Sequence, residues 1–242
     1  MLPRTRNGHL TQLRVFFGYA KRRGYLSRQD ATEPEILKKE KDGDTDSEVF
    51  PPEEMEKLLL TAPVHLIPLL AIGGFAGLRA AEIFRLDWGA VDLDRNLIEL
   101  RAGQAKTASR RIIPISDNLK AWLSLVPREG KVIPDRDYFR QATAMARNIG
   151  VRWPQNALRH SFISYRLAEV EDAAKVALEA GNSPAIIFKH YRELVTADAA
   201  KQWFGITPPD NWIPPQTNWN RRVERKPTQD VAATAVPSPW TT

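Results

Sequence analysis

The sequence predicts a mainly α-helical chain with a small antiparallel β-sheet, an α+β fold. Apolar residues recur at helical spacing through most of residues 51–205. Two short segments rich in Ile and Leu, 97–101 and 111–115, are typical of strands, and the stretch 103–110 between them fits a hairpin tip. Hydrophobic residues make up 43% of the 242 residues, which is enough to bury a core.

The first 50 residues fall into two parts of opposite charge. Residues 8–24 are predicted to form an amphipathic helix that ends at Gly24, and residues 1–29 carry seven Lys or Arg and no acidic residue. This basic segment fits either a nucleic-acid contact or a solvated face. Residues 30–50 are crowded with acidic side chains and are expected to be an exposed linker.

Pro51 and Pro52 are expected to open the helical part of the chain, since proline is tolerated in a first helical turn. The residues after Gly205 are rich in proline and lack periodicity, so 206–242 is expected to be a largely disordered tail. Further helices are predicted at 65–75, 80–86, 116–126, 136–149, 155–168, 172–180, 184–191 and 196–204.

Composition excludes several classes of protein. Cysteine is absent, which rules out disulfides and thiolate chemistry, and no apolar run approaches the ~20 residues that a membrane-spanning helix needs. No Walker-type loop and no carboxylate cluster with metal-ligand spacing is present, so neither a metal nor a cofactor is expected. The net charge of +6 suits a polyanionic partner.

Four separated motifs carry residues suited to phosphate chemistry. They are Gly-Leu-Arg79-Ala-Ala-Glu-Ile, the hairpin pair Lys106-Thr107, Asn156-Ala-Leu-Arg159-His-Ser-Phe, and Gly181-Asn182-Ser-Pro with Tyr191 ten residues after the glycine. A buried arginine must meet a carboxylate or another anion. Each motif alone is more often structural than functional.

The order and spacing of these motifs resemble the catalytic domain of the tyrosine recombinases, the phage integrase family, over about residues 50–205. The resemblance implies that family's fold and a DNA cleavage and rejoining reaction through a 3′-phosphotyrosyl intermediate, without metal or ATP. It assigns Tyr191 as nucleophile, Arg79 and Arg159 as a phosphate clamp and Lys106 as general acid. A bidentate arginine clamp and a lysine acid suit a reaction in which negative charge develops on phosphate oxygens.

Two positions depart from the family pattern. Asn156 stands where the family usually has His, and Asn182 stands where it has His or Trp. Asparagine can donate a hydrogen bond to phosphate but cannot shuttle a proton. Both positions are therefore expected to contact phosphate, and the rate of reaction is in question.

Neighbouring side chains have less certain roles. We expect Glu82 to be a structural partner of Arg79, and His160 to point elsewhere on its helix in a structural role. His190 would either orient Tyr191 or face solvent. Arg110 and Arg111 would contact the DNA backbone or be solvated on the hairpin, and Trp203 and Phe204 would anchor a neighbouring protomer or pack within their own domain.

The resemblance also bears on organisation and partners. The resemblance implies that residues 1–29 correspond to the last helix of a core-binding domain. This is expected of a fragment, a truncated gene or an engineered version. DNA binding should then be weak and salt-dependent. The implied partner is double-stranded DNA, bound as a tetramer, with a monomer when free. The implied setting is the bacterial cytoplasm at the nucleoid, away from membranes.

Three interpretations remain open from the residues. The first is an active site-specific recombinase of a mobile element. The second is a DNA-binding relic weakened by Asn156, Asn182 and the short N-terminus. The third is a strand-passing enzyme that resembles a type IB topoisomerase.

Overall fold

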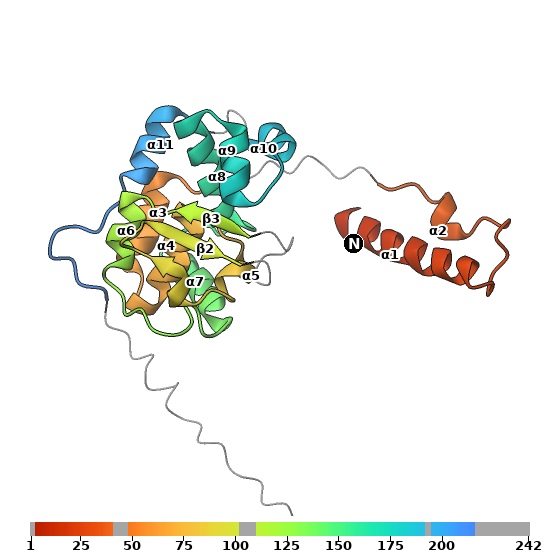
Figure 1. Ribbon diagram of the computed structural model, residues 1–242, viewed down its shortest axis with the longest axis horizontal. Coiled ribbons are helices and arrows are strands. Elements are labelled where there is room, and N and C mark those ends of the chain that lie inside the picture. Colours follow the sequence, from red (N-terminus) through yellow and green to blue (C-terminus); the bar gives the residue numbers. More distant parts are fainter. Residues whose placement is uncertain (1–2, 41–47, 102–109, 192–194, 216–242) are drawn as a thin grey trace, which may run out of the picture. The chain divides into compact units, whose positions relative to one another are not determined.

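The computed structural model describes residues 3–40, 48–101, 110–191 and 195–215 (Figure 1). The chain divides into two compact units, Met1–Ser47 and Glu48–Thr242. Each unit is described by itself.

The first unit consists of α1 (Pro3–Arg22) and the short helix α2 (Glu33–Ile36). The guanidinium group of Arg14 on α1 donates hydrogen bonds to the carbonyl oxygens of Pro34 and Leu37, at 2.6 and 2.5 Å. Part of the span that we expected to be a linker is thus a helix that contacts α1.

The second unit is built around α4 (Ile67–Phe75), whose nine residues are all buried. α4 contacts α3 (Pro52–Thr61), α5 (Ala80–Ile83), α6 (Asp117–Leu123), α7 (Asp137–Asn148) and α8 (Ala157–Val170). The remaining helices are α9 (Ala173–Ala180), α10 (Pro184–Tyr191), α11 (Ala197–Phe204) and the 3-10 helices Val64–Leu66 and Trp88–Ala90. Figure 1 shows α8 to α11 gathered at one end of this unit.

The sheet is antiparallel, with strand order β1 (Val91–Asp92), β2 (Leu97–Leu100) and β3 (Arg111–Pro114). Ile98 pairs with Ile113 across β2 and β3, and both side chains are fully buried. The predicted mainly helical fold with a small antiparallel sheet is confirmed. β1 was not predicted, because two residues are too few to display an alternating pattern.

Most helix boundaries lie within three residues of the predicted ones, and α10 coincides with the predicted 184–191, whereas α1 begins five residues before the predicted start at residue 8. α8 begins two residues later than predicted because Asn156 has a positive φ of 58° and therefore lies outside the helix. The predicted helix 65–75 is divided between a 3-10 turn and α4.

Trp203 lies in the core of its own unit. Its side chain is fully buried, its ring stacks on Tyr165 at a centroid distance of 4.4 Å, and its indole N–H donates to the carbonyl of Gly74 at 3.0 Å. Of the two roles considered for Trp203, packing within its own domain is the one observed. Trp212 packs edge-to-face on Trp122, so the start of the predicted tail is docked, while residues 216–242 lie outside the described residues.

A separate apolar cluster joins α8, α9 and α10. It contains Phe162, Ile163, Val176, Ala177, Ala180, Ile187 and Tyr191. The ring of Tyr191 is therefore part of a packed core, which limits the positions that its hydroxyl group can take. Across the described ranges, we find no helix with the length and apolar character needed to cross a membrane.

Candidate active site

Arg79 is held at the start of α5 by Glu82. The backbone N–H of Arg79 donates to Glu82 Oε2 at 2.8 Å, and its guanidinium Nη1 donates to Oε1 at 3.1 Å. The expected pairing of these two residues is confirmed. Arg79 Nη2 also donates to the carbonyl oxygen of Gly181 at 2.7 Å, across 102 positions of sequence. This bond ties the start of α5 to the turn that precedes α10.

Arg111 is buried and paired with a carboxylate, which corrects the expectation that it is solvated on the hairpin. Its side chain is 8% exposed, and its two terminal nitrogens donate to Glu82 Oε1 and Oε2 at 3.0 and 2.7 Å. Arg110, by contrast, is largely exposed and pairs with Glu99. The sequence could not distinguish the two arginines, since only the packing of β3 decides which one points inward.

The carboxylate of Glu82 is buried between these cations. Burial opposes its charged form, but hydrogen bonds and positive charge from Arg111 and Arg79 outweigh burial and lower its pKa below the ordinary 4.5. Glu82 therefore remains an anion at neutral pH and holds two arginines in place.

Gly181 occupies a position that only glycine fits. Its φ is +63°, and a Cβ atom there would lie 2.5 Å from Arg111 Nη1. The left-handed conformation and the close guanidinium both exclude a side chain. The turn before α10 can thus approach the pair formed by Arg111 and Glu82.

Arg159 presents an unsatisfied guanidinium nitrogen. The residue is 9% exposed, its Nη1 donates to the carbonyl of Gly77 at 2.6 Å, and its buried Nη2 has no hydrogen-bond partner among the described residues. Burial, followed by the positive charge of Arg79, lowers its pKa to about 10, so the group is still charged at neutral pH. A buried cation with a free N–H is suited to receive an anion.

The hydroxyl group of Tyr191 meets His160. The oxygen lies 2.6 Å from His160 Nδ1, and the two rings stack at a centroid distance of 5.5 Å with an interplanar angle of 27°. We expected His160 to point elsewhere on its helix, and that expectation is wrong. The contact spans 31 positions, so no local pattern in the sequence could have indicated it.

Comparison with known proteins places this geometry in context. No protein-family model matches the chain. Tyrosine recombinase XerA of Thermococcus kodakarensis is 33% identical over 152 residues, covering 54% of this chain and 52% of the relative. The chain thus spans about half the length of this curated relative.

Solved structures with the same fold include the integrase of the transposon Tn1549 in complex with circular intermediate DNA. That structure has a TM-score of 0.55 and 15% identity, and covers 83% of this chain and 78% of the integrase. The integrase from mycobacterium phage Brujita has a TM-score of 0.51 and 18% identity, with coverage of 84% and 78%. In part of its sequence and in its fold, the chain resembles the tyrosine recombinases.

The structure brings some of the predicted site residues together. Arg79, Asn156 and Arg159 line one small depression. Asn156 is exposed at the start of α8, and Asn182 is half-buried next to Gly181. Lys106 lies outside the described residues.

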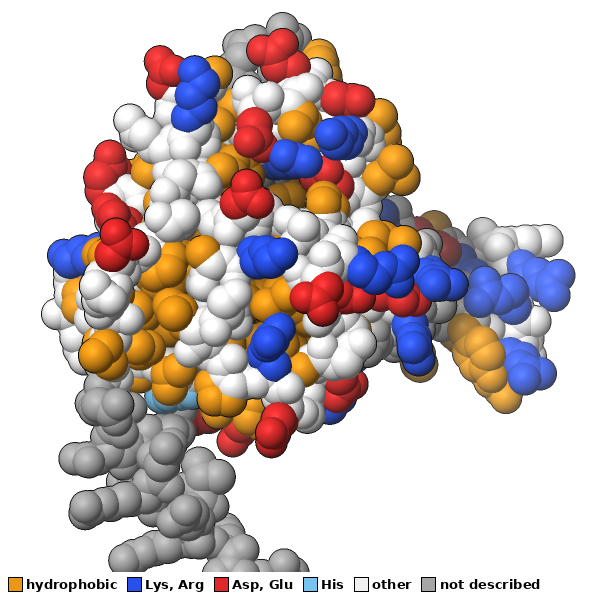
Figure 2. Space-filling view, turned by 60° about the vertical axis from the view of Figure 1, so that its left-hand side comes forward, with side chains coloured by type: hydrophobic (Ala, Val, Ile, Leu, Met, Phe, Trp, Pro, Cys, Tyr) orange, Lys and Arg blue, Asp and Glu red, His pale blue; other side chains and the backbone are white. Residues whose placement is uncertain are grey.

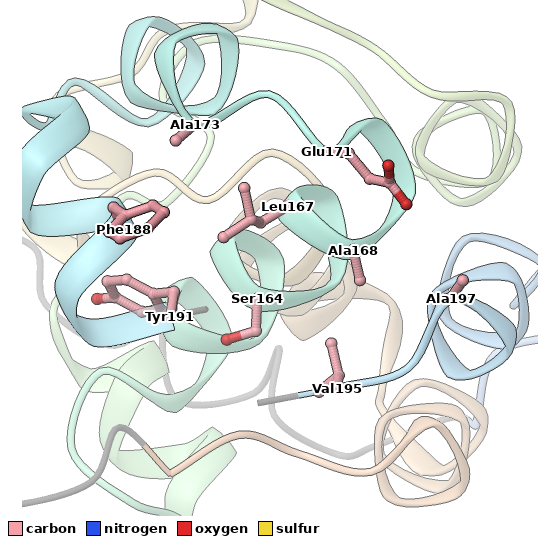
Figure 3. Close-up of a pocket in the computed structure, with 9 residues that line it drawn as sticks. All are labelled: Ser164, Leu167, Ala168, Glu171, Ala173, Phe188, Tyr191, Val195 and Ala197. Carbon is pink, nitrogen blue, oxygen red and sulfur yellow. The ribbon is translucent and has the colours of Figure 1, made fainter. Parts of the chain in front are cut away.

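A larger cavity of about 780 Å³ adjoins the other side of Tyr191 (Figure 3). It lies between α8, α10 and the start of α11, and its walls include Leu167, Ala168 and Phe188. Figure 3 shows the Tyr191 hydroxyl directed away from Ala168 and Ala197. This largely apolar cavity therefore faces the tyrosine side chain and not its hydroxyl oxygen.

The surface of the protein carries mixed charge on the face drawn in Figure 2. There the described acidic and basic side chains are interspersed, with hydrophobic side chains between them. The concentrated positive charge of the site comes instead from partly buried arginines. Within the described ranges, His, Asp and Glu side chains form no group of three placed to hold a metal ion.

Proposed function

We propose that this chain cleaves and rejoins double-stranded DNA, with Tyr191 as nucleophile. The phenolic oxygen attacks a backbone phosphorus, the bond from phosphorus to the 5′ oxygen breaks, and a 3′-phosphotyrosyl bond forms. Arg79 and Arg159 hold the non-bridging oxygens. Lys106 gives a proton to the departing 5′ oxygen, and Asn156 and Asn182 donate hydrogen bonds to the phosphate.

One observation carries the proposal: the hydroxyl group of Tyr191 contacts His160 on α8, the helix that also carries a buried arginine with an unsatisfied nitrogen. Arg159 precedes His160 on α8, and its Nη2 has no hydrogen-bond partner in the described part of the chain. Positive charge near a developing phosphorane is the usual means by which phosphoryl-transfer enzymes stabilise the transition state. The 33% identity to a tyrosine recombinase supports the same chemistry.

The organisation and setting of the proposed enzyme follow the same reasoning. We assign residues 51–205 to the catalytic domain, 1–29 to the last helix of a core-binding domain, 30–50 to the connection and 206–242 to a tail. The two structural neighbours above are a transposon integrase and a phage integrase, which supports a role in the movement of a mobile element. A tetramer on DNA would bring four such sites to the two duplexes being exchanged.

A covalent trapping experiment tests the nucleophile without knowledge of the target sequence. The full chain is incubated with a library of nicked duplexes of random sequence, in which cleavage releases a short strand that diffuses away. Protein recovered under denaturing conditions should carry DNA, and sequencing of that DNA gives the preferred site. Tyr191→Phe should carry none, while Tyr138→Phe, a tyrosine on α7, should still carry DNA.

The outcomes separate the remaining interpretations. DNA binding without any adduct indicates a relic that has lost catalysis, as the asparagines at 156 and 182 would allow. Relaxation of supercoiled plasmid without recombination between two copies of the selected site indicates a topoisomerase-like enzyme. An adduct that persists in Tyr191→Phe would refute the assignment of the nucleophile.

A further inference from the structure

His160 is the residue that faces the reactive oxygen of Tyr191. Its Nδ1 lies 2.6 Å from that oxygen, within the range for a hydrogen bond to a hydroxyl group. We infer that His160 Nδ1 is the general base that takes the hydroxyl proton of Tyr191. The inference rests on the proposed function and adds a catalytic residue to it.

The need for such a base follows from the nucleophile. A tyrosine hydroxyl has a pKa of about 10, so it is almost entirely protonated at neutral pH and attacks phosphorus slowly. Asn156 begins the turn of α8 that carries His160, and its carbonyl accepts the backbone N–H of His160 at 2.9 Å. An amide side chain at that position cannot accept a proton, whereas the imidazole one turn later can.

The surroundings of His160 keep its ring in the form that a base requires. The titratable groups that act on it are Arg159 on its own helix and Tyr191 and His190 on α10. Burial, followed by the positive charge of Arg159, lowers the pKa of His160 below its ordinary value of 6.5. The neutral ring with its proton on Nε2 leaves Nδ1 free to accept the tyrosine O–H.

Each proton transferred during cleavage is returned during rejoining. In cleavage, the Tyr191 proton passes to His160 Nδ1 as the bond from oxygen to phosphorus forms, and the 5′ oxygen leaves with a proton from the general acid. In rejoining, the general acid takes back the proton of the attacking 5′ hydroxyl as its bond to phosphorus forms, and the imidazolium of His160 returns its proton to the departing tyrosine oxygen. His160 is therefore neutral before each cycle and after it.

Substitution by asparagine tests the base separately from the hydrogen bond. His160→Asn places an amide near the former position of Nδ1, and should slow adduct formation at neutral pH by about 100-fold or more, the usual contribution of a general base. His65→Asn makes the same chemical change at a histidine outside the proposed site, whose ring contacts Gln141 on α7, and should alter the rate by less than about threefold, a small fraction of that contribution.

Replacement of Tyr191 by trifluorotyrosine decides between a base and a structural support. That phenol ionises near neutral pH and needs no base, so it should restore most of the rate lost in His160→Asn. An equal defect with tyrosine and with trifluorotyrosine would overturn the inference. The proposed function would survive that result, because it requires only that the covalent adduct depend on Tyr191. If no adduct depends on Tyr191, the proposed function and the inference about His160 are both refuted.

The tautomer of His160 gives a test that needs no DNA. Nitrogen-15 spectra of the labelled full chain at neutral pH should show Nδ1 unprotonated and Nε2 protonated, with the Nδ1 resonance shifted by Tyr191→Phe. A proton on Nδ1 would mean that the histidine donates to the tyrosine oxygen, and this would overturn the inference whatever the activity.

Discussion

Arg111 and Glu82 form a bidentate ion pair in which both partners are almost fully buried, with side-chain exposures of 8% and 1%. The pair joins β3 to α5, and Arg79 shares the same carboxylate. Because Arg79 in turn holds the carbonyl of Gly181, one carboxylate connects three segments of the site. This arrangement leads to the first two predictions.

Glu82→Gln should destabilise the protein by about 3–5 kcal/mol, since it leaves two arginines without their counter-ion in a buried site. The free energy of unfolding, measured by urea denaturation at neutral pH, checks this value. Glu99→Gln is a matched control because its partner Arg110 is 68% exposed, and exposed pairs contribute less than about 1 kcal/mol. An equal decrease in the free energy of unfolding in the two variants would contradict the role given to Glu82.

The same carboxylate predicts a dependence of stability on pH. The pKa of Glu82 is lower in the folded protein than its ordinary 4.5, so its contribution is complete above that value and is lost as the pH falls through the folded pKa. The stability difference between the parent chain and Glu82→Gln should therefore shrink as urea denaturation is repeated at progressively lower pH. A difference that does not change with pH would show that Glu82 is not an anion in the folded state.

Gly181→Ala should destabilise the protein by more than the ~1–2 kcal/mol that a left-handed conformation costs an ordinary residue, because the new methyl group would also meet Arg111. Gly150→Ala separates the two effects. Gly150 also has a positive φ, of +76°, but a Cβ atom there meets nothing within 4 Å. If thermal unfolding shows that both variants lose the same amount of stability, the approach of Arg111 to Gly181 has no energetic consequence.

Arg159 should make the protein bind inorganic phosphate. Phosphate at 100 times its dissociation constant would raise the free energy of unfolding by about 2.7 kcal/mol, detectable as a rise in Tm. Arg159→Lys keeps the charge but loses the second N–H donor, so phosphate should bind it about tenfold more weakly. Arg95→Lys changes an exposed arginine in the same way, serves as the control, and should bind phosphate as the parent does.

Trp203→Ala should cost about 3–5 kcal/mol in urea denaturation, because it removes a fully buried ring that stacks on Tyr165. Trp203→Phe retains an aromatic ring but loses the hydrogen bond to Gly74, and should cost less. Leu178→Ala is the control, since that side chain is 77% exposed. A small effect of Trp203→Ala would revive the interpretation in which Trp203 binds a neighbouring protomer.

The sequence by itself determined the helices, the β2–β3 hairpin and the order of the site residues along the chain. These features depend on local patterns: apolar spacing along α10, the glycine at 181 and the arginines within their motifs. Local preferences act over a few residues, so they can be recognised in the sequence. The likeness to the tyrosine recombinases rests on this same order.

Only the tertiary structure decided which side chains meet. Arg111 and Arg110 are adjacent in sequence, yet one is buried against Glu82 and the other is exposed, because β3 turns alternate residues to opposite faces. His160 faces Tyr191 because α8 and α10 pack on each other, which no spacing within either helix specifies. Contacts between segments far apart in sequence depend on how whole helices and strands pack. For that reason Tyr191 could be singled out in the sequence as the proposed nucleophile, whereas its contact with His160 could not be predicted.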